Sequence, residues 1–356
     1  AQGGMIDTPN GDWYAFMFQD RGALGRAPVL IPMQFEQDFP VIGEKGKVPK
    51  EIQVPDTGYC YEKINGSDDF SYLPDEKGEI HLKCFWEWNH QSIDTAWSVT
   101  ENPGHLRLHS KKISPTLFQA YNTLTQRTVG NKCAAEVTVD CSQMKDGDVA
   151  GISTFIGNYG FIGVKRENEQ YYLIMMGRPA KDSSVFGQFE YENPGIEYQR
   201  VPISDTSVCL RAEADFTDKK DLASFFYKNR EGWQKLGIDQ PMYFKMDLFT
   251  GCRFGLFYYS TKQTGGFVDF SKFQFFEPYS HIIPSNLKSK LEQGKYYEFT
   301  YTIQGKGYIE DFDDVIKNIN PENVQLEDQN RIKVNLSIKE TDKIGLDQLQ
   351  EPICQK

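Results

Sequence analysis

The chain has 356 residues and a formal net charge of −11, from 50 acidic and 39 basic side chains. This acidic balance argues against a nucleic-acid partner, which would need a basic surface. No apolar stretch approaches the ~18–20 residues of a membrane-spanning helix, so we expect no membrane partner. Aromatic residues make up 14% of the chain and there are 30 glycines, a composition typical of antiparallel all-β proteins.

Residues 1–55 form the first predicted unit. An almost wholly apolar run, WYAFMF (13–18), lies between the turn signals Asn10-Gly11 and Asp20-Arg21-Gly22, and a second strand-like run covers residues 27–35. A short isolated hairpin is at best marginal in water. We therefore expect this unit to pack against other elements on both of its faces.

Residues 56–280 form the second predicted unit, a long succession of strands. In CAAEVTVD (133–140), Ala134, Glu136 and Thr138 alternate with the apolar Ala135, Val137 and Val139. This period of 2 indicates a strand with one solvent-exposed and one buried face. Pairs such as Asp146-Gly147 and Glu231-Gly232 are hairpin turn signals. This pattern predicts a two-sheet antiparallel sandwich.

Residues 281–356 form the third predicted unit and change in character. Strand-like runs cover residues 296–303 and 331–339, and residues 309–319 repeat apolar side chains on one helical face before Asn320-Pro321. This segment is predicted to be a small α+β module at the C-terminal end.

Seven cysteines are scattered along the chain without a C-x-x-C pair, and we interpret them mostly as buried thiols. No leader peptide is visible in the first residues. The compartment therefore stays open between a bacterial cytoplasm and secretion.

Several motifs carry a resemblance to a known family. QGGMIDTP (2–9), GDWY (11–14), LGR (24–26) and DFPVIG (38–43) resemble the last blade of the five-bladed propeller of glycoside hydrolase family 43. WEWNH (86–90), WSVTENPG (97–104) and MKDGDVAG (144–151) resemble the concanavalin-A-like sandwich that follows this propeller in many such enzymes. The resemblance covers about residues 1–280. It implies an all-β fold, a concanavalin-A-like antiparallel β-sandwich preceded by one propeller blade.

The resemblance also implies an activity. Such enzymes, of the β-xylosidase or α-L-arabinofuranosidase type, hydrolyse xylosyl or arabinosyl bonds by inversion. The implied partners are a xylo- or arabino-oligosaccharide and the N-terminal propeller blades of the same parent protein. Inversion needs an acid and a base ~6.5–9.5 Å apart, which the family carries on earlier blades. No carboxylate here lies in a matching motif, so we assign no catalytic residue and expect this chain alone to be inactive.

Two other functions remain open. The sandwich could be a non-catalytic module that binds carbohydrate or supports a propeller. The chain could also be a scaffold that docks a partner through residues 281–356.

Three residues are candidate substrate contacts. Arg26 matches the arginine of the family's Gly-Arg pair, which points into the pocket and bonds the glycone, a role that suits a fixed fork of donors. Gln2 and Asp7 are candidates for the pocket rim. The competing interpretations are a surface or blade-bridging arginine for Arg26, and turn or cap hydrogen bonds for Gln2 and Asp7.

A structural Ca²⁺ is the candidate metal, and no cofactor is expected to be required. Asp69 and Asp269 lie near the first and last strands of the sandwich and could supply carboxylate ligands, although an aspartate at a strand edge is more often simply solvated. His105 and His109 are expected to be satisfied surface histidines rather than zinc ligands. Trp86 and Trp88 are expected to pack in the core rather than to stack on a sugar.

Overall fold

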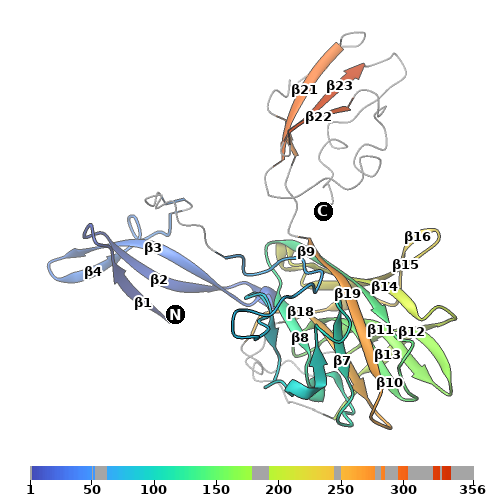
Figure 1. The fold of residues 1–356 in the computed structure, drawn as a ribbon. Coiled ribbons are helices and arrows are strands. Elements are labelled where there is room, and N and C mark those ends of the chain that lie inside the picture. The colour runs from blue at the N-terminus through green and yellow to red at the C-terminus, as the bar shows by residue number, and fades with distance from the viewer. Residues whose placement is uncertain are drawn as a thin grey trace.

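The structure is a computed structural model that describes residues 2–49, 51–52, 62–178, 192–243 and 250–276, together with the backbone of four strands beyond residue 281. Strands and short 3₁₀ turns are the regular elements in these ranges (Figure 1). Within the same ranges, no helix has the length and apolar character needed to cross a bilayer.

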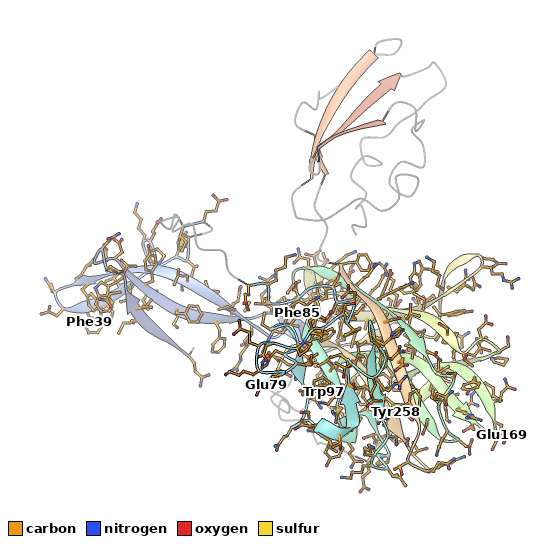
Figure 2. All side chains as sticks on the ribbon, viewed as in Figure 1. Phe39, Glu79, Phe85, Trp97, Glu169 and Tyr258 are labelled. Carbon is orange, nitrogen blue, oxygen red and sulfur yellow. The ribbon has the colours of Figure 1, made fainter. Side chains whose placement is uncertain are left out.

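The N-terminal unit is a four-stranded antiparallel meander, the arrangement of one propeller blade. Its strands follow chain order: β1 (Gly3–Asp7), β2 (Trp13–Asp20), β3 (Arg26–Glu36) and β4 (Phe39–Ile42). Ala15, Ile31 and Met33 form a small buried cluster on one face. Large apolar side chains stay exposed on both faces, including Met5 (57%) and Phe16 (52%). Phe39 projects from the part of the blade far from the sandwich (Figure 2).

The sandwich consists of two antiparallel sheets. The seven-stranded sheet has the order β13 (Ile196–Ile203), β12 (Gln170–Gly177), β11 (Gly160–Glu167), β10 (Asp148–Phe155), β18 (Arg253–Ser260), β8 (Leu124–Arg127) and β5 (Glu87–Trp88). The eight-stranded sheet has the order β16 (Gly232–Lys235), β15 (Leu222–Asn229), β14 (Ser207–Asp215), β9 (Lys132–Asp140), β19 (Phe267–Phe276), β7 (Leu106–His109) and β6 (Trp97–Ser98), with β17 (Gln240–Pro241) paired to β15.

Alternation along the strands places the core between these sheets. In β9, Val137 and Val139 are fully buried, whereas Glu136 and Thr138 are partly exposed on the outer face. The predicted period-2 pattern is therefore confirmed in this strand. β18 is buried on both faces, because the 3₁₀ turn η3 (Leu117–Gln119) covers the outer side of its sheet and forms a second cluster there with Phe257.

The blade contacts the sandwich through the tip of its β2–β3 hairpin. This tip is the 3₁₀ turn η1 (Gly22–Leu24), and its Ala23 is fully buried within the sandwich core cluster. The Cys252 N–H donates to the Ala23 carbonyl at 2.8 Å, and the Ala23 N–H donates to Asp221 Oδ2 at 3.1 Å. The blade is thus anchored to the sandwich by buried backbone.

A buried carboxylate joins the first and last segments of the sandwich. Asp68 is 2% exposed, and its backbone N–H donates to the Phe273 carbonyl at 2.9 Å. Its carboxylate accepts from the Phe70 N–H at 2.9 Å, Lys83 Nζ at 2.9 Å and Trp86 Nε1 at 2.7 Å. Full pairing of this kind is what a buried charge requires.

The C-terminal unit contains a four-stranded antiparallel sheet of order β20 (Ile282–Pro284), β21 (Tyr296–Ile303), β23 (Arg331–Ser337) and β22 (Val324–Asp328). The strands predicted at residues 296–303 and 331–339 correspond to β21 and β23. The predicted helix at residues 309–319 lies outside the described residues. The remaining 3₁₀ turns are η2 (Asp94–Ala96) and η4 (Thr217–Lys219).

Candidate functional site

Arg26 lies at the base of the blade, where β3 begins. The strand register places it directly opposite Asp20, and Arg26 Nε donates to Asp20 Oδ1 at 3.1 Å. Phe18 lies two residues before Asp20 in β2, on the same face of the sheet. Its ring centroid is 4.4 Å from the guanidinium carbon of Arg26. The cross-strand carboxylate and the aromatic face together orient the planar guanidinium.

Gln2 and Asp7 lie at different ends of β1. Gln2 immediately precedes β1, and continuing the β1–β2 register would place it beside Phe18, near Arg26. Asp7 ends β1 opposite Trp13. The five-residue separation puts Asp7 on the other face, ~17 Å along the strand. The register thus puts Gln2 at the same end of the blade as Arg26 and Asp7 at the other end, and the substrate role of all three stays a prediction.

Asp269 is held by an arginine and an amide. Arg107 donates from Nε to Oδ1 at 2.8 Å and from Nη2 to Oδ2 at 2.7 Å, and Asn102 Nδ2 donates to Oδ2 at 2.8 Å. Burial acts to raise the pKa of Asp269, but the bonds from Arg107 and Asn102 outweigh it and hold the pKa below its usual value. Asp69 Oδ1 instead accepts the Ser71 N–H at 3.0 Å. Calcium binding by this pair of aspartates stays a prediction.

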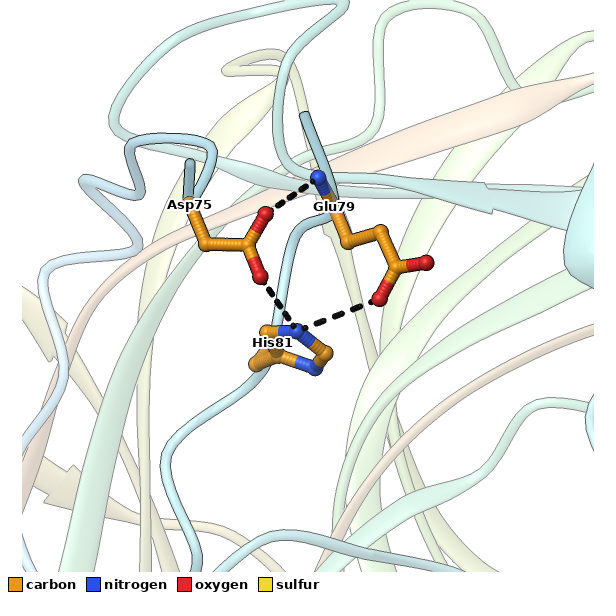
Figure 3. A group of neighbouring side chains, drawn as sticks. All are labelled: Asp75, Glu79 and His81. Atoms are coloured by element: carbon orange, nitrogen blue, oxygen red, sulfur yellow. Dashed lines mark hydrogen bonds and ion pairs between the residues drawn. The ribbon is translucent and has the colours of Figure 1, made fainter. Parts of the chain in front are cut away.

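A surface turn brings together Asp75, Glu79 and His81 (Figure 3). His81 Nε2 lies 3.3 Å from Asp75 Oδ2 and 3.6 Å from Glu79 Oε2. The other Asp75 oxygen accepts the backbone N–H groups of Glu79 and Lys77, both at 2.8 Å, and the bond from Glu79 is the main cause of its lowered pKa. Among the described residues, Asp75, Glu79 and His81 form the one group of three potential metal ligands whose ligand atoms lie close together. All three side chains are exposed.

The aromatic and histidine pairs behave as structural groups. Trp86 is 8% exposed and contacts Phe273 edge-on, with ring centroids 4.8 Å apart, whereas Trp88 lies against Trp97 at 5.2 Å. His109 Nε2 lies 3.0 Å from a Glu101 carboxylate oxygen. Trp86 and Trp88 therefore pack against other aromatic rings, as predicted from the sequence. His109 has a carboxylate partner, as predicted for a satisfied surface histidine.

Sequence reasoning missed a hollow on the sandwich. It has a volume of about 690 Å³ and is lined by residues 90–93, 112–114, 118, 119 and 121. The first two segments follow β5 and β7, and the third begins within η3 and continues past its end. No motif marks the hollow, because its walls come from three separate stretches of chain.

Comparisons with known proteins agree with this architecture. Residues 75–276 match the family model described as "Beta xylosidase C-terminal Concanavalin A-like domain". A β-xylosidase of Formosa agariphila is 26% identical over 307 residues, which cover 77% of this chain and 47% of that protein. The chain spans about half the length of this relative and of a xylosidase/arabinosidase of Butyrivibrio fibrisolvens.

Two solved structures are similar in both fold and sequence. A bifunctional GH43-CE protein of Bacteroides eggerthii is 33% identical with a TM-score of 0.68, covering 86% of this chain and 38% of that one. An engineered GH43 glycoside hydrolase with endo-xylanase and exo-arabinofuranosidase activity is 28% identical with a TM-score of 0.67, covering 77% and 54%. Because the family model matches more than half of the sequence, the chain belongs to the family of β-xylosidase C-terminal concanavalin-A-like domains of glycoside hydrolase family 43.

Proposed function

We propose that this chain is the C-terminal part of a glycosidase that cleaves xylosyl or arabinosyl bonds of plant-wall oligosaccharides by inversion. The names of its relatives, β-xylosidase and xylosidase/arabinosidase, support this substrate class. The observation that carries the proposal is the blade. It is a single four-stranded sheet with large apolar side chains exposed on both faces, and such surfaces favour further blades packed on either side.

In this proposal, the acid and base lie on blades outside the present sequence. Inversion requires two carboxyl groups ~6.5–9.5 Å apart, with room for the attacking water between them. The present blade would supply Arg26, whose guanidinium is oriented by Asp20 and Phe18. Gln2, at the same end of the sheet, would extend the polar rim, and Asp7 would contribute only if the neighbouring blade covers its face.

The test compares this chain with the longer product of its own locus. Both are assayed on the 4-nitrophenyl glycosides of β-xylose and α-L-arabinofuranose. We expect turnover from the longer protein and none from residues 1–356, because a missing acid and base remove most of the transition-state stabilisation. Turnover by purified residues 1–356, retained after rigorous removal of host enzymes, would refute the proposal that the acid and the base lie outside this sequence.

A second candidate function is a non-catalytic module that binds carbohydrate. The observation that favours it is the hollow on the sandwich, which lies on a sheet with its own complete core. If the longer protein is inactive on both glycosides while residues 1–356 bind oligosaccharide, this second function is the better description.

A further inference from the structure

The hollow on the sandwich is a pre-formed groove. The buried amide of Asn122 pairs with both peptide groups of Ile93, donating from Nδ2 to the carbonyl and accepting at Oδ1 from the N–H, each at 3.1 Å. Ser114 Oγ donates to the Gln119 carbonyl at 3.0 Å, which joins two of the lining segments. Phe118 is 4% exposed and packs edge-on against Phe155 below the groove. A rigid wall costs little ordering on binding.

The groove combines hydrogen-bonding groups with the rings of Phe118 and Tyr121. His90 Nε2 lies 2.7 Å from the Phe118 carbonyl, which can only accept, so Nε2 carries the hydrogen and Nδ1 of the neutral ring is an acceptor. Gln91 and Gln119 add amides, and Tyr121 adds a half-exposed ring. The volume of the groove, about 690 Å³, is within the range of small-ligand sites, ~300–1,000 Å³. This mixture suits a polyhydroxylated ligand.

The charge of the groove differs from that of the whole chain. Lys112 lines the groove, and its ammonium lies 3.1 Å from Tyr121 Oη and 4.7 Å from the centroid of that ring. None of the residues that line the groove is an Asp or Glu, although the chain has 11 more acidic than basic residues. Among the ion pairs of the described residues, none involves Lys112. The groove therefore presents a cation without a carboxylate partner.

The groove is also remote from the blade. β18 begins at Arg253, next to the Cys252 contact with the hairpin tip, and ends at Ser260, whose carbonyl accepts the Ser114 N–H at 2.8 Å. Eight strand residues span ~25 Å. The two ends of this strand thus separate the blade anchor from the groove.

We propose that this groove binds an acidic oligosaccharide, one whose uronic acid residue places its carboxylate on Lys112. The sugar hydroxyls bond the amides of Gln91 and Gln119 and the Nδ1 acceptor of His90, and Tyr121 keeps the Lys112 ammonium at the groove. The choice of a sugar as ligand rests on the proposed function. The requirement for a carboxylate goes beyond it.

Calorimetric titration of the full chain tests the proposal with two probes that share the same xylotetraose backbone. One is xylotetraose with a glucuronic acid branch, and the other is xylotetraose with an arabinose branch. We expect the acidic probe to bind ~5-fold more tightly, as for a partly exposed ion pair, with the preference falling as salt rises. Lys112→Met should abolish the preference and leave the arabinose probe unaffected. Tyr121→Phe, which keeps the ring but removes the hydroxyl bonded to Lys112, should reduce the preference.

Lys228→Met is the matched control. Lys228 also lies over an aromatic ring, Trp233 at 5.7 Å, but on the other sheet, so its variant should bind both probes as the native chain does. Equal affinity for the two probes, or an undiminished preference in Lys112→Met, overturns the proposal. Hydrolysis by the longer protein without probe binding by this chain would overturn this inference alone, whereas probe binding without hydrolysis would overturn only the proposed catalytic function.

Discussion

Replacing Gly251 with alanine should release the blade from the sandwich. A Cβ at Gly251 would lie 2.0 Å from the Leu24 carbonyl oxygen and 2.6 Å from the Leu24 carbonyl carbon. Both are backbone atoms, which cannot rotate away as the end of a side chain could. The two backbones must therefore separate by roughly 1 Å or more before the oxygen contact becomes tolerable.

That separation breaks specific contacts. The bonds from the Cys252 N–H to the Ala23 carbonyl and from the Ala23 N–H to Asp221 are 2.8 and 3.1 Å long, and each contributes ~1 kcal/mol. Exposure of Ala23 and part of Leu24 adds about 1–2 kcal/mol of lost apolar burial. The docked state should thus lose about 2–4 kcal/mol relative to the detached state.

Hydrogen exchange at the Ala23 and Cys252 amides measures this loss directly. If docking limits exchange, both amides should exchange roughly 30- to 1,000-fold faster in Gly251→Ala than in the native chain. Gly4→Ala is the matched control, because a Cβ at this blade glycine meets nothing within 4 Å. Native protection of both amides in Gly251→Ala would refute the reasoning.

Four further predictions concern stability and binding. Asp68→Ala should lower the free energy of unfolding by about 3–5 kcal/mol, because it leaves buried donors such as Trp86 Nε1 unpaired, and urea unfolding measures this. Burial raises the pKa of Asp221, so the native chain loses stability as pH rises through that pKa. Asp221→Asn should therefore melt higher than the native chain at neutral pH, by a margin that shrinks on acidification. Arg26→Ala in the longer enzyme should cost ~1.5–3 kcal/mol of transition-state binding with little change in melting temperature. A lowered melting temperature with unchanged kinetics would instead make Arg26 a structural residue. A peptide of residues 1–50 should give a poorly dispersed NMR spectrum, and a cooperative fold in isolation would contradict the expected need for neighbours.

Local patterns predicted the strands but not their partners. The alternation in residues 133–140 identified β9, because a strand with one buried face repeats at period 2 whatever lies beside it. Nothing local could show that β10 pairs with β18, about a hundred residues further along the chain. The sandwich and the blade were predictable as a pair because their motifs resemble a known family, and the family match over residues 75–276 supports that resemblance for the sandwich.

Side-chain sites were harder to predict for the same reason. The sequence suggested Asp269 as a calcium ligand, but strand pairing places it opposite Arg107, which bonds both of its oxygens. The Asp75-Glu79-His81 turn could have been found from the close spacing of its ligands and from Gly78 at a left-handed position. The groove around Lys112 gave no local signal, because its shape depends on contacts between three segments.

The pairing of Asp68 with Phe273 has a mechanical consequence. The first and last segments of the sandwich are joined there, by the Asp68 N–H bond to the Phe273 carbonyl and by a bond from the Phe275 N–H to Ser67 Oγ, both 2.9 Å. A pulling force applied between the segment just before Ser67 and the segment just after Phe275 therefore meets this short latch first. While the latch holds, the roughly two hundred residues between its ends carry little of the load. Such a module can be inserted into or removed from a longer chain with little change in the path of that chain.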